Sequence, residues 1–335
     1  LIDIKISDQA VSQYFKYSYI NGPYSIYQNI KKLSPGEMIK IKFKNDCIST
    51  FEKFFWFKLE LTFFQKNFQK NLVYTDIVRQ SHELLLSSVK KQIIADAKVG
   101  CFLSGGVDSS LIAAMMAKDI NNLETFTIGS NDKSYDESIY AKKFAKHLGA
   151  SHNLINFNEI DLELHLDNVA KTFCEPLSDS SQIATSIVSS LASRKVKAVL
   201  TGDGGDELFG GYYRYGSGLK IWKKLNKIGL KSILNGILNI LETSPPEFFF
   251  NIVSKFGINN GRDKIKKLKF LNKISNLDQY YLYLMSNSLE GEKSFLMKNN
   301  LENIKLKRLK NLSDEAQLCL WDQQIIYLEI SSKNR

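Results

Sequence analysis

The sequence predicts an α/β protein: a parallel sheet with helices on both faces, followed by a helical C-terminal region. Between residues 74 and 200, short apolar runs typical of buried strands alternate with longer amphipathic segments typical of helices. Glycine-rich turns follow the first and the last of these apolar runs. Because ligands of such sheets bind beyond the carboxyl ends of the strands, we expect both turns to lie at a ligand site.

The length and composition are those of a globular protein. A chain of 335 residues exceeds the ~100–200 residues of a typical domain, which favours two domains or one domain with appendages. Hydrophobic residues make up 44% of the chain, but no run reaches the ~18–20 apolar residues of a membrane span. Residues 1–6 alternate like a strand rather than a signal peptide, so we expect a cytoplasmic protein with no membrane partner.

The net charge of +10 comes from the C-terminal third of the chain. Residues 1–211 hold 24 basic and 24 acidic side chains, whereas residues 212–335 hold 21 basic and 11 acidic ones. Only six of the 45 basic residues are arginine, and the excess lysine fits AT-rich codon usage as well as it fits function. Net charge is a weak indicator of function, so we do not expect nucleic-acid binding.

Cysteine and histidine form no metal-binding or disulfide pattern. The cysteines are Cys47, Cys101, Cys174 and Cys319, and the histidines are His82, His147, His152 and His165. They are scattered, without the paired spacings of zinc sites or disulfide frameworks. We interpret the cysteines as reduced core thiols and the histidines as structural or exposed.

The first glycine-rich turn has the chemistry of a phosphate cradle. Residues 98–103 read as a buried strand, residues 104–109 have the sequence Ser-Gly-Gly-Val-Asp-Ser, and an apolar helix follows. Backbone N–H groups at such a turn point at an anion, and the helix macrodipole favours negative charge there. No Gly-Lys-Ser/Thr follows, so the turn is not of the Walker type, and Asp108 suits Mg²⁺ bridging to pyrophosphate. The alternative is an ordinary strand-to-helix turn.

The N-terminal residues are too few to bury a core alone. We expect a helix over residues 8–15, a turn at 21–23, a strand pair around 34–37 and strand-like alternation over 38–43. We interpret the phenylalanine- and lysine-rich residues 45–70 as a linker.

The central residues predict the alternating elements of the sheet. Beside the strand over 98–103, further strands are expected over 123–129 and 152–157, and helices over 74–94, from 135–138 to Gly149, and over 162–173. The side chains expected to face the core are Ile77, Leu84, Leu85, Val89 and Ile93 from the first helix and Ile139, Ala141, Phe144, Ala145 and Leu148 from the second.

A second polar connection precedes a helix expected over residues 183–192. Residues 175–181 have the sequence Glu-Pro-Leu-Ser-Asp-Ser-Ser, which is dense in small polar side chains. One interpretation is a helix start capped by Ser180 or Asp179. The other adds a surface that binds the α-amino and carboxyl groups of a substrate.

The second glycine-rich turn follows a short strand expected to be buried over residues 198–200. Residues 201–212 have the sequence Thr-Gly-Asp-Gly-Gly-Asp-Glu-Leu-Phe-Gly-Gly-Tyr. Together with Asp179, its carboxylates would repel one another without a cation, which favours Mg²⁺–pyrophosphate as a ligand. The spacing does not match a dinucleotide-binding fingerprint, and a glycine-rich solvent loop is the alternative.

The residues beyond 212 read as helices with solvated charged faces. Helices are expected over 221–241 with a break near Gly229, from residue 245, and over 277–289 and 312–328. The lysine clusters at 264–269 and 305–310 are interpreted as solvated.

These motifs resemble a known enzyme family. The Ser-Gly-Gly-Val-Asp-Ser string is similar to the PP-loop of ATP pyrophosphatases, whose fold is adenine nucleotide alpha hydrolase-like. Together with Phe-Thr-Ile-Gly at 126–129 and the motifs at 175–181 and 201–212, it resembles the synthetase domain of glutamine-hydrolysing asparagine synthetases. The segments 23–27 and 30–36 resemble the end of the glutaminase domain in that family.

The resemblance implies a domain organisation. Residues 1–57 would be a remnant of the C-terminal part of a glutaminase (Ntn-type) domain and a linker, and residues 71–335 a synthetase domain truncated at its C-terminus. The family's glutaminase nucleophile is an N-terminal cysteine, and this chain begins at Leu1, so we expect no glutaminase activity. Residues 321–328 resemble the point where family members continue towards a catalytic lysine.

The resemblance also implies a reaction and a site. ATP would adenylate the side-chain carboxylate of aspartate with release of pyrophosphate, and ammonia would then displace AMP to give asparagine. ATP would contact Leu103, Ile128, Thr201 and Gly202, its pyrophosphate would contact Ser104, Gly105, Gly106, Asp108 and Ser109, and Mg²⁺ would lie on Asp108 and Asp206. Asp203 would be catalytic, although it stands where the family usually has glutamate, which shortens its reach by one methylene.

Other functions and partners stay open at this point. A related amidotransferase would act on a sugar acid or another carboxylate in surface-polysaccharide synthesis. A tRNA-modifying PP-loop enzyme fits the second motif poorly, and an inactive fragment is the non-catalytic alternative. The partners implied are aspartate or a related carboxylate, ammonia or glutamine, a separate glutaminase chain, and a second copy in a homodimer.

Overall fold

The computed structural model describes residues 4–34, 36–56, 73–130, 132, 136–156, 159–226, 236, 274–286 and 318. By its contacts the chain divides into two compact units, and each is described by itself. The sheet unit comprises Leu59–Cys174 and Asp179–Gly205, and the second unit comprises Leu1–Lys58, Glu175–Ser178 and Asp206–Arg335. Within the described ranges, no helix is long and apolar enough to cross a bilayer.

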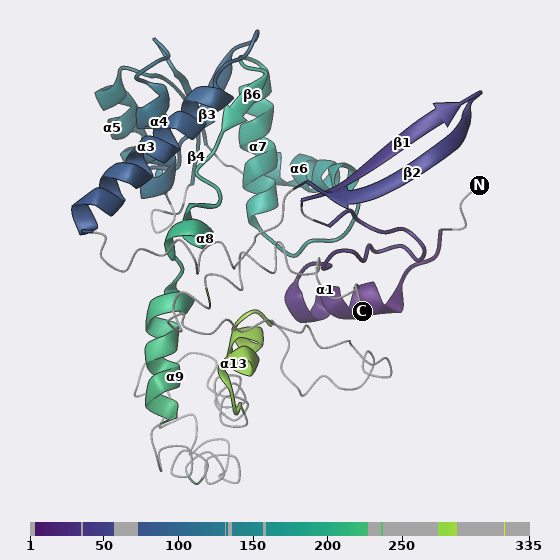
Figure 1. Ribbon diagram of the computed structural model, residues 1–335. Helices are drawn as coiled ribbons and strands as arrows, with labels where there is room; N and C mark the ends of the chain where they lie inside the picture. The colour runs from purple at the N-terminus through teal and green to yellow at the C-terminus, as the bar shows by residue number, and fades with distance from the viewer. Residues whose placement is uncertain are drawn as a thin grey trace. The chain divides into compact units, whose positions relative to one another are not determined.

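The sheet unit contains a four-stranded parallel sheet with the strand order β5-β4-β3-β6. Figure 1 labels three of these strands, β3, β4 and β6. Its elements in chain order are α3 (Tyr74–Gln92), β3 (Val99–Phe102), α4 (Val107–Met116), β4 (Glu124–Gly129), α5 (Ser138–Leu148), β5 (Ser151–Asn156), α6 (Glu159–Thr172), α7 (Ser181–Ser193) and β6 (Ala198–Leu200). The chain places β4 and β5 on one side of β3 and then returns to place β6 on the other side. The loops after β3 and β6 therefore leave the sheet side by side at a topological switch point.

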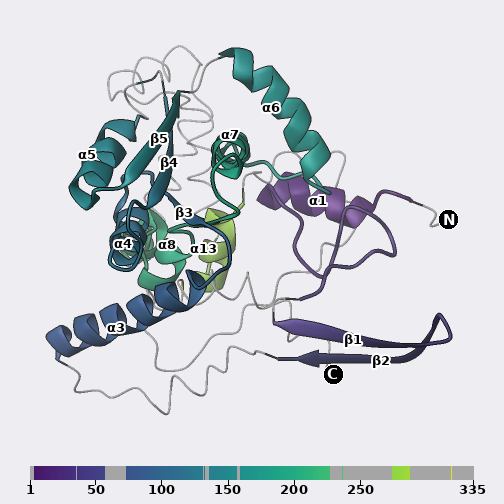
Figure 2. The same cartoon turned by 90° about the horizontal axis from the view of Figure 1, so that it is seen from above.

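Helices cover both faces of this sheet, as predicted (Figure 2). Helices α3, α4 and α5 lie on one face and α7 lies on the other. Residues alternate between the two cores along β3, because Cys101 and Leu103 pack into the first core and Phe102 packs into the second. Phe126 of β4 is the central large side chain of the second core, at 1% exposure. The predicted α/β fold class is therefore confirmed.

Some predicted core positions of the sheet unit are wrong. Leu84 is 73% exposed and Ile77 is 45% exposed, because only the later turns of α3, around Val89, pack against the core. Ile139 is 56% exposed, whereas the other predicted inner positions of α5 are buried or packed against the core. The strand β6 lies at the edge of the sheet, so its first residue Ala198 is exposed and the next two are half-buried.

Two of the cysteines are also exposed. Cys47 and Cys174 are free and exposed, whereas Cys101 is buried and free as predicted. Burial raises the pKa of the Cys101 thiol to about 12, so this side chain behaves as a small apolar core residue. The prediction for Cys319 falls outside the described residues.

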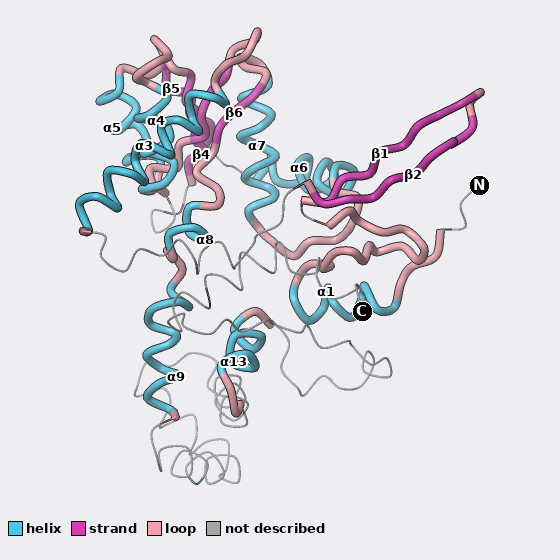
Figure 3. The backbone as a smooth tube through the Cα atoms, in the orientation of Figure 1, coloured by secondary structure: helices cyan, strands magenta, loops and turns pink. Residues whose placement is uncertain are grey.

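The N-terminal part of the second unit contains one helix and one hairpin. Helix α1 (Asp8–Tyr17) begins at Ser7, whose hydroxyl accepts a hydrogen bond from the Ala10 N–H. Strands β1 (Glu37–Lys44) and β2 (Cys47–Phe55) form an antiparallel hairpin (Figure 3). The predicted linker is therefore wrong over residues 47–55. The register shifts between Lys42 and Phe43, which leaves Ser49 of β2 without a partner residue in the register. Strand β2 is exposed along almost its whole length, so it lacks the buried face by which a strand is recognised in a sequence.

The described C-terminal part of the second unit contains short helices. They are α8 (Gly205–Phe209), the π-helix η1 (Arg214–Gly218), α9 (Leu219–Leu225) and α13 (Leu277–Leu284). The last three contribute to an aromatic core, whereas α8 buries none of its residues. The ring of Trp222 stacks on that of Tyr280 with centroids 4.9 Å apart, and the Tyr280 hydroxyl donates to the Gly218 carbonyl at 2.7 Å. The start of the helix predicted over 221–241 is confirmed by α9, and the helix predicted over 277–289 is confirmed as far as Leu284. Apart from Gly236 and Leu318, residues 227–273 and 287–335 lie outside the described residues, and with them the other predicted C-terminal helices and both lysine clusters.

Candidate nucleotide-binding site

The loop after β3 starts from a buried anchor, Leu103. This residue is 1% exposed, its N–H donates to the Phe126 carbonyl at 2.9 Å, and its carbonyl accepts a hydrogen bond from the Thr127 hydroxyl. Both partners belong to β4. The residues that follow Leu103 therefore leave the carboxyl edge of the sheet from a fixed position.

Two serines close this loop onto the first turn of α4. The hydroxyls of Ser104 and Ser109 lie 2.9 Å apart, and Ser109 Oγ also accepts from the Ser104 N–H at 3.2 Å. The Gly106 N–H donates to Ser104 Oγ at 3.2 Å. Ser104 is exposed and Ser109 is 8% exposed, so Ser109 supports the loop from inside while Ser104 is open to a ligand.

Gly105 can only be glycine, for two independent reasons. Its φ is +90°, a conformation that side chains rarely adopt. A Cβ at this position would also lie 2.9 Å from the Ala141 backbone nitrogen and 3.1 Å from the Glu137 carbonyl oxygen, at the start of α5. The N-cap residue of α4 is Gly106, so no side chain at this position caps the first amides of the helix.

The loop after β6 packs directly on the start of α4. A Cβ on Gly202 would lie 2.6 Å from the Ser109 backbone nitrogen, and one on Gly205 would lie 2.6 Å from the Asp108 carboxyl carbon. Gly204 has a φ of +90°, so glycine is required there by conformation alone. The structure thus brings Asp108 and the second glycine-rich turn together, as expected for neighbouring strands at a switch point.

The remaining acidic residues have local partners. Asp203 is exposed, and its Oδ2 accepts a hydrogen bond from Thr201 Oγ1 at 2.8 Å. Asp206 belongs to the second unit, where its carboxylate lies against Gly211, since a Cβ on that glycine would be 1.9 Å from Oδ1. In the described part of the chain, no three His, Cys, Asp or Glu side chains gather as metal ligands would.

Of the two residues expected to cap the helix after residues 175–181, Asp179 does so and Ser180 does not. Asp179 Oδ1 accepts from the Ser181 N–H at 2.9 Å at the start of α7, whereas Ser180 makes no side-chain capping bond. The Asp179 carboxylate is exposed, so it is free to face a ligand as well.

Ile128 lies in β4, next to β3. It is half-buried and pairs with Ile155 of β5. Leu103, Thr201 and Gly202 lie at the switch point, and Ile128 lies one strand away from it.

Sequence reasoning missed three residues that shape the site. Thr127 anchors Leu103, Gly205 accommodates Asp108, and Asp136 Oδ1 accepts from the N–H groups of Ser138 and Ser130 at 3.1 and 3.3 Å. Hydrogen bonds from Ser138 hold the pKa of Asp136 below its ordinary value. Gly205 and Asp136 lie in stretches that the sequence singled out, but their roles depend on neighbours that no local pattern specifies.

The fold and the site define a parallel α/β domain with two glycine-rich loops at its switch point. The family model described as Asparagine synthase matches residues 80–322, which include both loops. The chain belongs to the asparagine synthase family.

Similar proteins include several glutamine-hydrolysing asparagine synthetases. "Putative asparagine synthetase [glutamine-hydrolyzing] 2" of Methanocaldococcus jannaschii is 34% identical over 247 residues, which cover 70% of this chain and 46% of that protein. "Asparagine synthetase [glutamine-hydrolyzing] 1" of Bacillus subtilis is 31% identical over 235 residues, which cover 69% of this chain and 35% of that protein. The chain thus spans less than half the length of these relatives.

A solved structure with some likeness is the NH₃-dependent NAD synthetase from Campylobacter jejuni. It is 15% identical, with a TM-score of 0.29, and the match covers 59% of this chain and 97% of that one.

Proposed function

We propose that this chain catalyses ATP-dependent amide formation on the side-chain carboxylate of aspartate. The carboxylate attacks the α-phosphorus of ATP, the bond to the β-phosphate breaks, and aspartyl-AMP and pyrophosphate form. Ammonia then attacks the acyl carbon, and AMP leaves with the bonding electron pair. The observation that carries the proposal is the contact of Asp108 with Gly205, which unites the two glycine-rich loops in a chain of the asparagine synthase family.

The two loops are proposed to bind different parts of ATP. Ser104, Gly105, Gly106, Asp108 and Ser109 bind the pyrophosphate portion, with the amides at the start of α4 stabilising its developing negative charge. Leu103, Ile128, Thr201 and Gly202 contact the remainder of the nucleotide. The carboxylates of Asp108 and Asp206 hold Mg²⁺, which neutralises charge on the leaving pyrophosphate when it is bound.

Asp203 is proposed to handle the proton of the incoming ammonia. Its carboxylate is exposed and is oriented by the Thr201 hydroxyl, so it is available as a base. The short Asp203 side chain also fits an acceptor that differs from aspartate, such as a sugar acid.

Domain boundaries are part of the proposal. Residues 71–335 are proposed to form the synthetase domain, which the family match over 80–322 supports. Residues 1–57 are proposed to be the C-terminal part of a glutaminase-type domain and a linker, on the resemblance of the segments at 23–27 and 30–36.

The binding half of the proposal is tested by thermal unfolding with Mg²⁺–ATP. At a nucleotide concentration 100-fold above Kd, the wild type is expected to gain about 2.7 kcal/mol of stability, seen as a rise in Tm. Asp108→Ala should abolish the rise while keeping the Tm of the nucleotide-free protein. Asp119→Ala, which removes a carboxylate paired with Lys90, is the matched control and should keep the rise. An undiminished rise in Asp108→Ala contradicts the proposal.

The reaction half is tested by AMP release with ammonia and a panel of carboxylates. We expect AMP only when ATP, aspartate and ammonia are all present. If AMP is released only with a sugar acid, that sugar acid and not aspartate is the acceptor. The absence of AMP with every carboxylate in the panel would contradict the proposed activity.

A further inference from the structure

A short piece of chain between α6 and α7 belongs to a different unit from the helices around it. Residues Glu175–Ser178 fall in the second unit, whereas α6, Asp179 and α7 fall in the sheet unit. This piece is the first half of the polar connection at residues 175–181. Its contacts with the N-terminal residues are therefore internal to the second unit.

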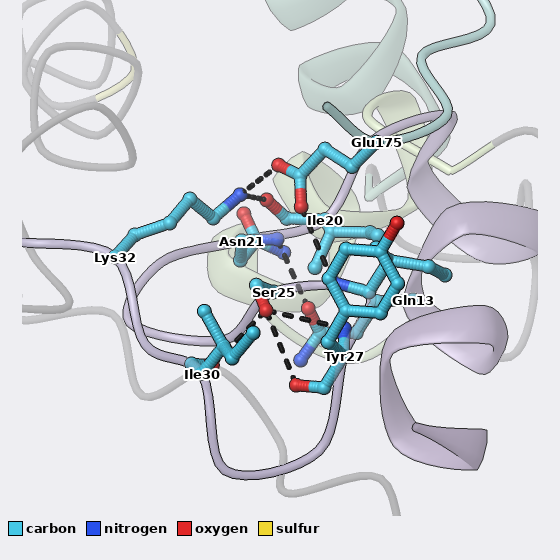
Figure 4. Close-up of polar contacts among 9 residues, drawn as sticks. Gln13, Ile20, Asn21, Ser25, Tyr27, Ile30, Lys32 and Glu175 are labelled. Carbon is cyan, nitrogen blue, oxygen red and sulfur yellow. Dashed lines mark hydrogen bonds and ion pairs between the residues drawn. The ribbon is translucent and has the colours of Figure 1, made fainter. Parts of the chain in front are cut away.

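Glu175 is the centre of these contacts (Figure 4). One carboxylate oxygen pairs with Lys32 Nζ, and the other accepts from the Ile26 N–H at 3.3 Å. Lys32 Nζ also donates to the Ile20 carbonyl at 2.6 Å. Three residues further on, the Ser178 N–H donates to the carbonyl of Ser18, the C-cap of α1, at 2.8 Å.

The N-terminal segment that makes these contacts is itself tightly bonded. Ser25 is 8% exposed, and its hydroxyl lies 3.0 Å from the Ile30 carbonyl and 3.1 Å from the Tyr27 carbonyl. The Asn21 N–H donates to Gln13 Oε1 at 3.0 Å (Figure 4). Residues 7–32, which we call the N-terminal platform, therefore present Lys32 and the Ile26 N–H to Glu175 in a defined geometry.

Each part of the connection at 175–181 thus has hydrogen bonds within its own unit. The N-terminal platform holds Glu175 and Ser178, and Asp179, the next residue, is bonded to the start of α7. The side chains of Lys32 and Glu175 are only 35% and 25% exposed, so removal of one charge leaves the other partly desolvated and without its partner. The family model matches residues 80–322 and does not include the platform at residues 7–32. The family match therefore says nothing about what the platform does.

We propose that Lys32 and Glu175 are positioning residues that set the conformation of residues 175–181 as the surface for the acceptor carboxylate. The proposal rests on the proposed function for the identity of the bound molecule, and on the motif resemblance of residues 175–181 for the location of the acceptor surface. The proposal concerns the acceptor and not ATP, because the loop at Ser104–Ser109 is held by hydrogen bonds of its own within the sheet unit.

The experiment combines hydrogen exchange with steady-state kinetics on the full chain. In Lys32→Met and Glu175→Gln, amides over residues 174–182 should exchange faster, while those over residues 103–110 stay unchanged. The KM for the acceptor should rise roughly 3- to 10-fold with the KM for ATP unchanged, because a small displacement of a positioning group weakens one substrate contact. The effects of Lys32→Met and Glu175→Gln on the acceptor KM should be non-additive in the double variant. Lys32→Arg keeps the positive charge, so its exchange rates and KM values should stay near those of the wild type.

The chain offers a matched control in the hairpin. Glu37 also pairs with a lysine, Lys53, at 2.6 Å and also accepts a backbone N–H bond, from Ser34 at 2.9 Å. Lys53→Met should leave the exchange of residues 174–182 and both KM values unchanged.

The outcomes separate this proposal from the proposed function. Unchanged exchange over 174–182 in Lys32→Met, or changed exchange with an unchanged acceptor KM, overturns the positioning role. If the wild type forms no AMP with any carboxylate, the proposed function fails, and hydrogen exchange alone still decides whether the platform holds this connection.

Discussion

Glycine at position 205 determines where Asp108 lies. The carboxylate of Asp108 occupies the space that a Cβ on Gly205 would need, with its carbon and both oxygens 2.6–2.9 Å from that position. Gly204, its neighbour, is glycine for a different reason, since its φ is +90° and nothing lies within 4 Å of its Cβ position. Packing against Asp108 therefore requires glycine at position 205, and backbone conformation requires it at position 204.

These two glycines give a paired prediction. Gly205→Ala should displace Asp108 and weaken Mg²⁺–ATP binding about tenfold or more, because overpacking of this kind costs about 1–3 kcal/mol. Gly204→Ala should lower the free energy of unfolding by roughly 1–2 kcal/mol through its left-handed backbone while leaving Asp108 in place. Calorimetric titration with Mg²⁺–ATP and urea unfolding of both variants measure the two effects. Equal loss of nucleotide affinity in both variants would contradict the assignment.

Helix α5 supports the loop after β3 although it contributes no predicted ligand. The backbone of its first turn lies against Gly105, and Asp136 holds that turn through the Ser138 N–H and ties it to Ser130 at the end of β4. The position of the loop therefore depends on a capping bond outside the loop.

Loss of this capping bond is expected to weaken the proposed nucleotide binding. Asp136→Ala should accelerate amide exchange in the first turn of α5, lower Tm by a few degrees and weaken Mg²⁺–ATP binding several-fold. Asp136→Asn keeps an oxygen that can accept both N–H bonds, so its effects should be smaller. If Asp136→Ala frays α5 without any change in ATP affinity, α5 does not position the loop.

The elements differ in how far the sequence predicts them. The strands and helices of the sheet unit follow from apolar periodicity, and Gly149 ends α5 as expected with a φ of +66°. Strand β2 was not predicted, because it is exposed along almost its whole length and therefore lacks the buried face that produces apolar alternation. The exposed half of α3 was not predicted either, because periodicity identifies an apolar stripe but not how much of its length finds a partner.

Whole-molecule contacts could not be predicted from local patterns. The approach of Gly205 to Asp108 and the pair of Lys32 with Glu175 join residues far apart in the chain, and both depend on the order of elements in space. Asp108 and Ser109 of the first glycine-rich turn do lie against Gly202 and Gly205 of the second, because β3 and β6 are neighbours at the switch point.

The edge of the sheet opposite the candidate site carries a stabilising carboxylate, Glu124. Its Oε2 accepts from Asn153 Nδ2 at 2.7 Å and lies 3.6 Å from Lys195 Nζ. Burial raises the pKa of Glu124, but the Asn153 hydrogen bond and the charges of Lys195 and Lys98 outweigh it and hold that pKa below its ordinary value of 4.5. A depressed pKa means that the stabilisation is complete above pH 4.5 and is lost as pH falls through the folded-state value.

Glu124→Gln is therefore expected to act on stability and not on the site. At pH 7 the variant should lose about 1 kcal/mol of unfolding free energy, and the difference from wild type should shrink as pH falls below 4.5. Denaturant unfolding across this pH range measures the effect. Mg²⁺–ATP affinity at pH 7 should be unchanged, and a constant difference at all pH values would contradict the role of the ionised carboxylate.

Because β6 pairs with β3 but comes last in the chain, the proposed nucleotide site would be completed only after the other strands of the sheet. Strands β3, β4 and β5 follow one another in the chain and can associate as soon as they are made, but the partner loop of Asp108 arrives only with β6. A nascent or partly folded chain would contain the loop after β3 but not yet the loop after β6 that packs against Asp108. If the proposed nucleotide site is correct, nucleotide affinity depends on the pairing of β3 with β6, the strand pairing with the largest sequence separation in the sheet, and bound nucleotide would stabilise that pairing.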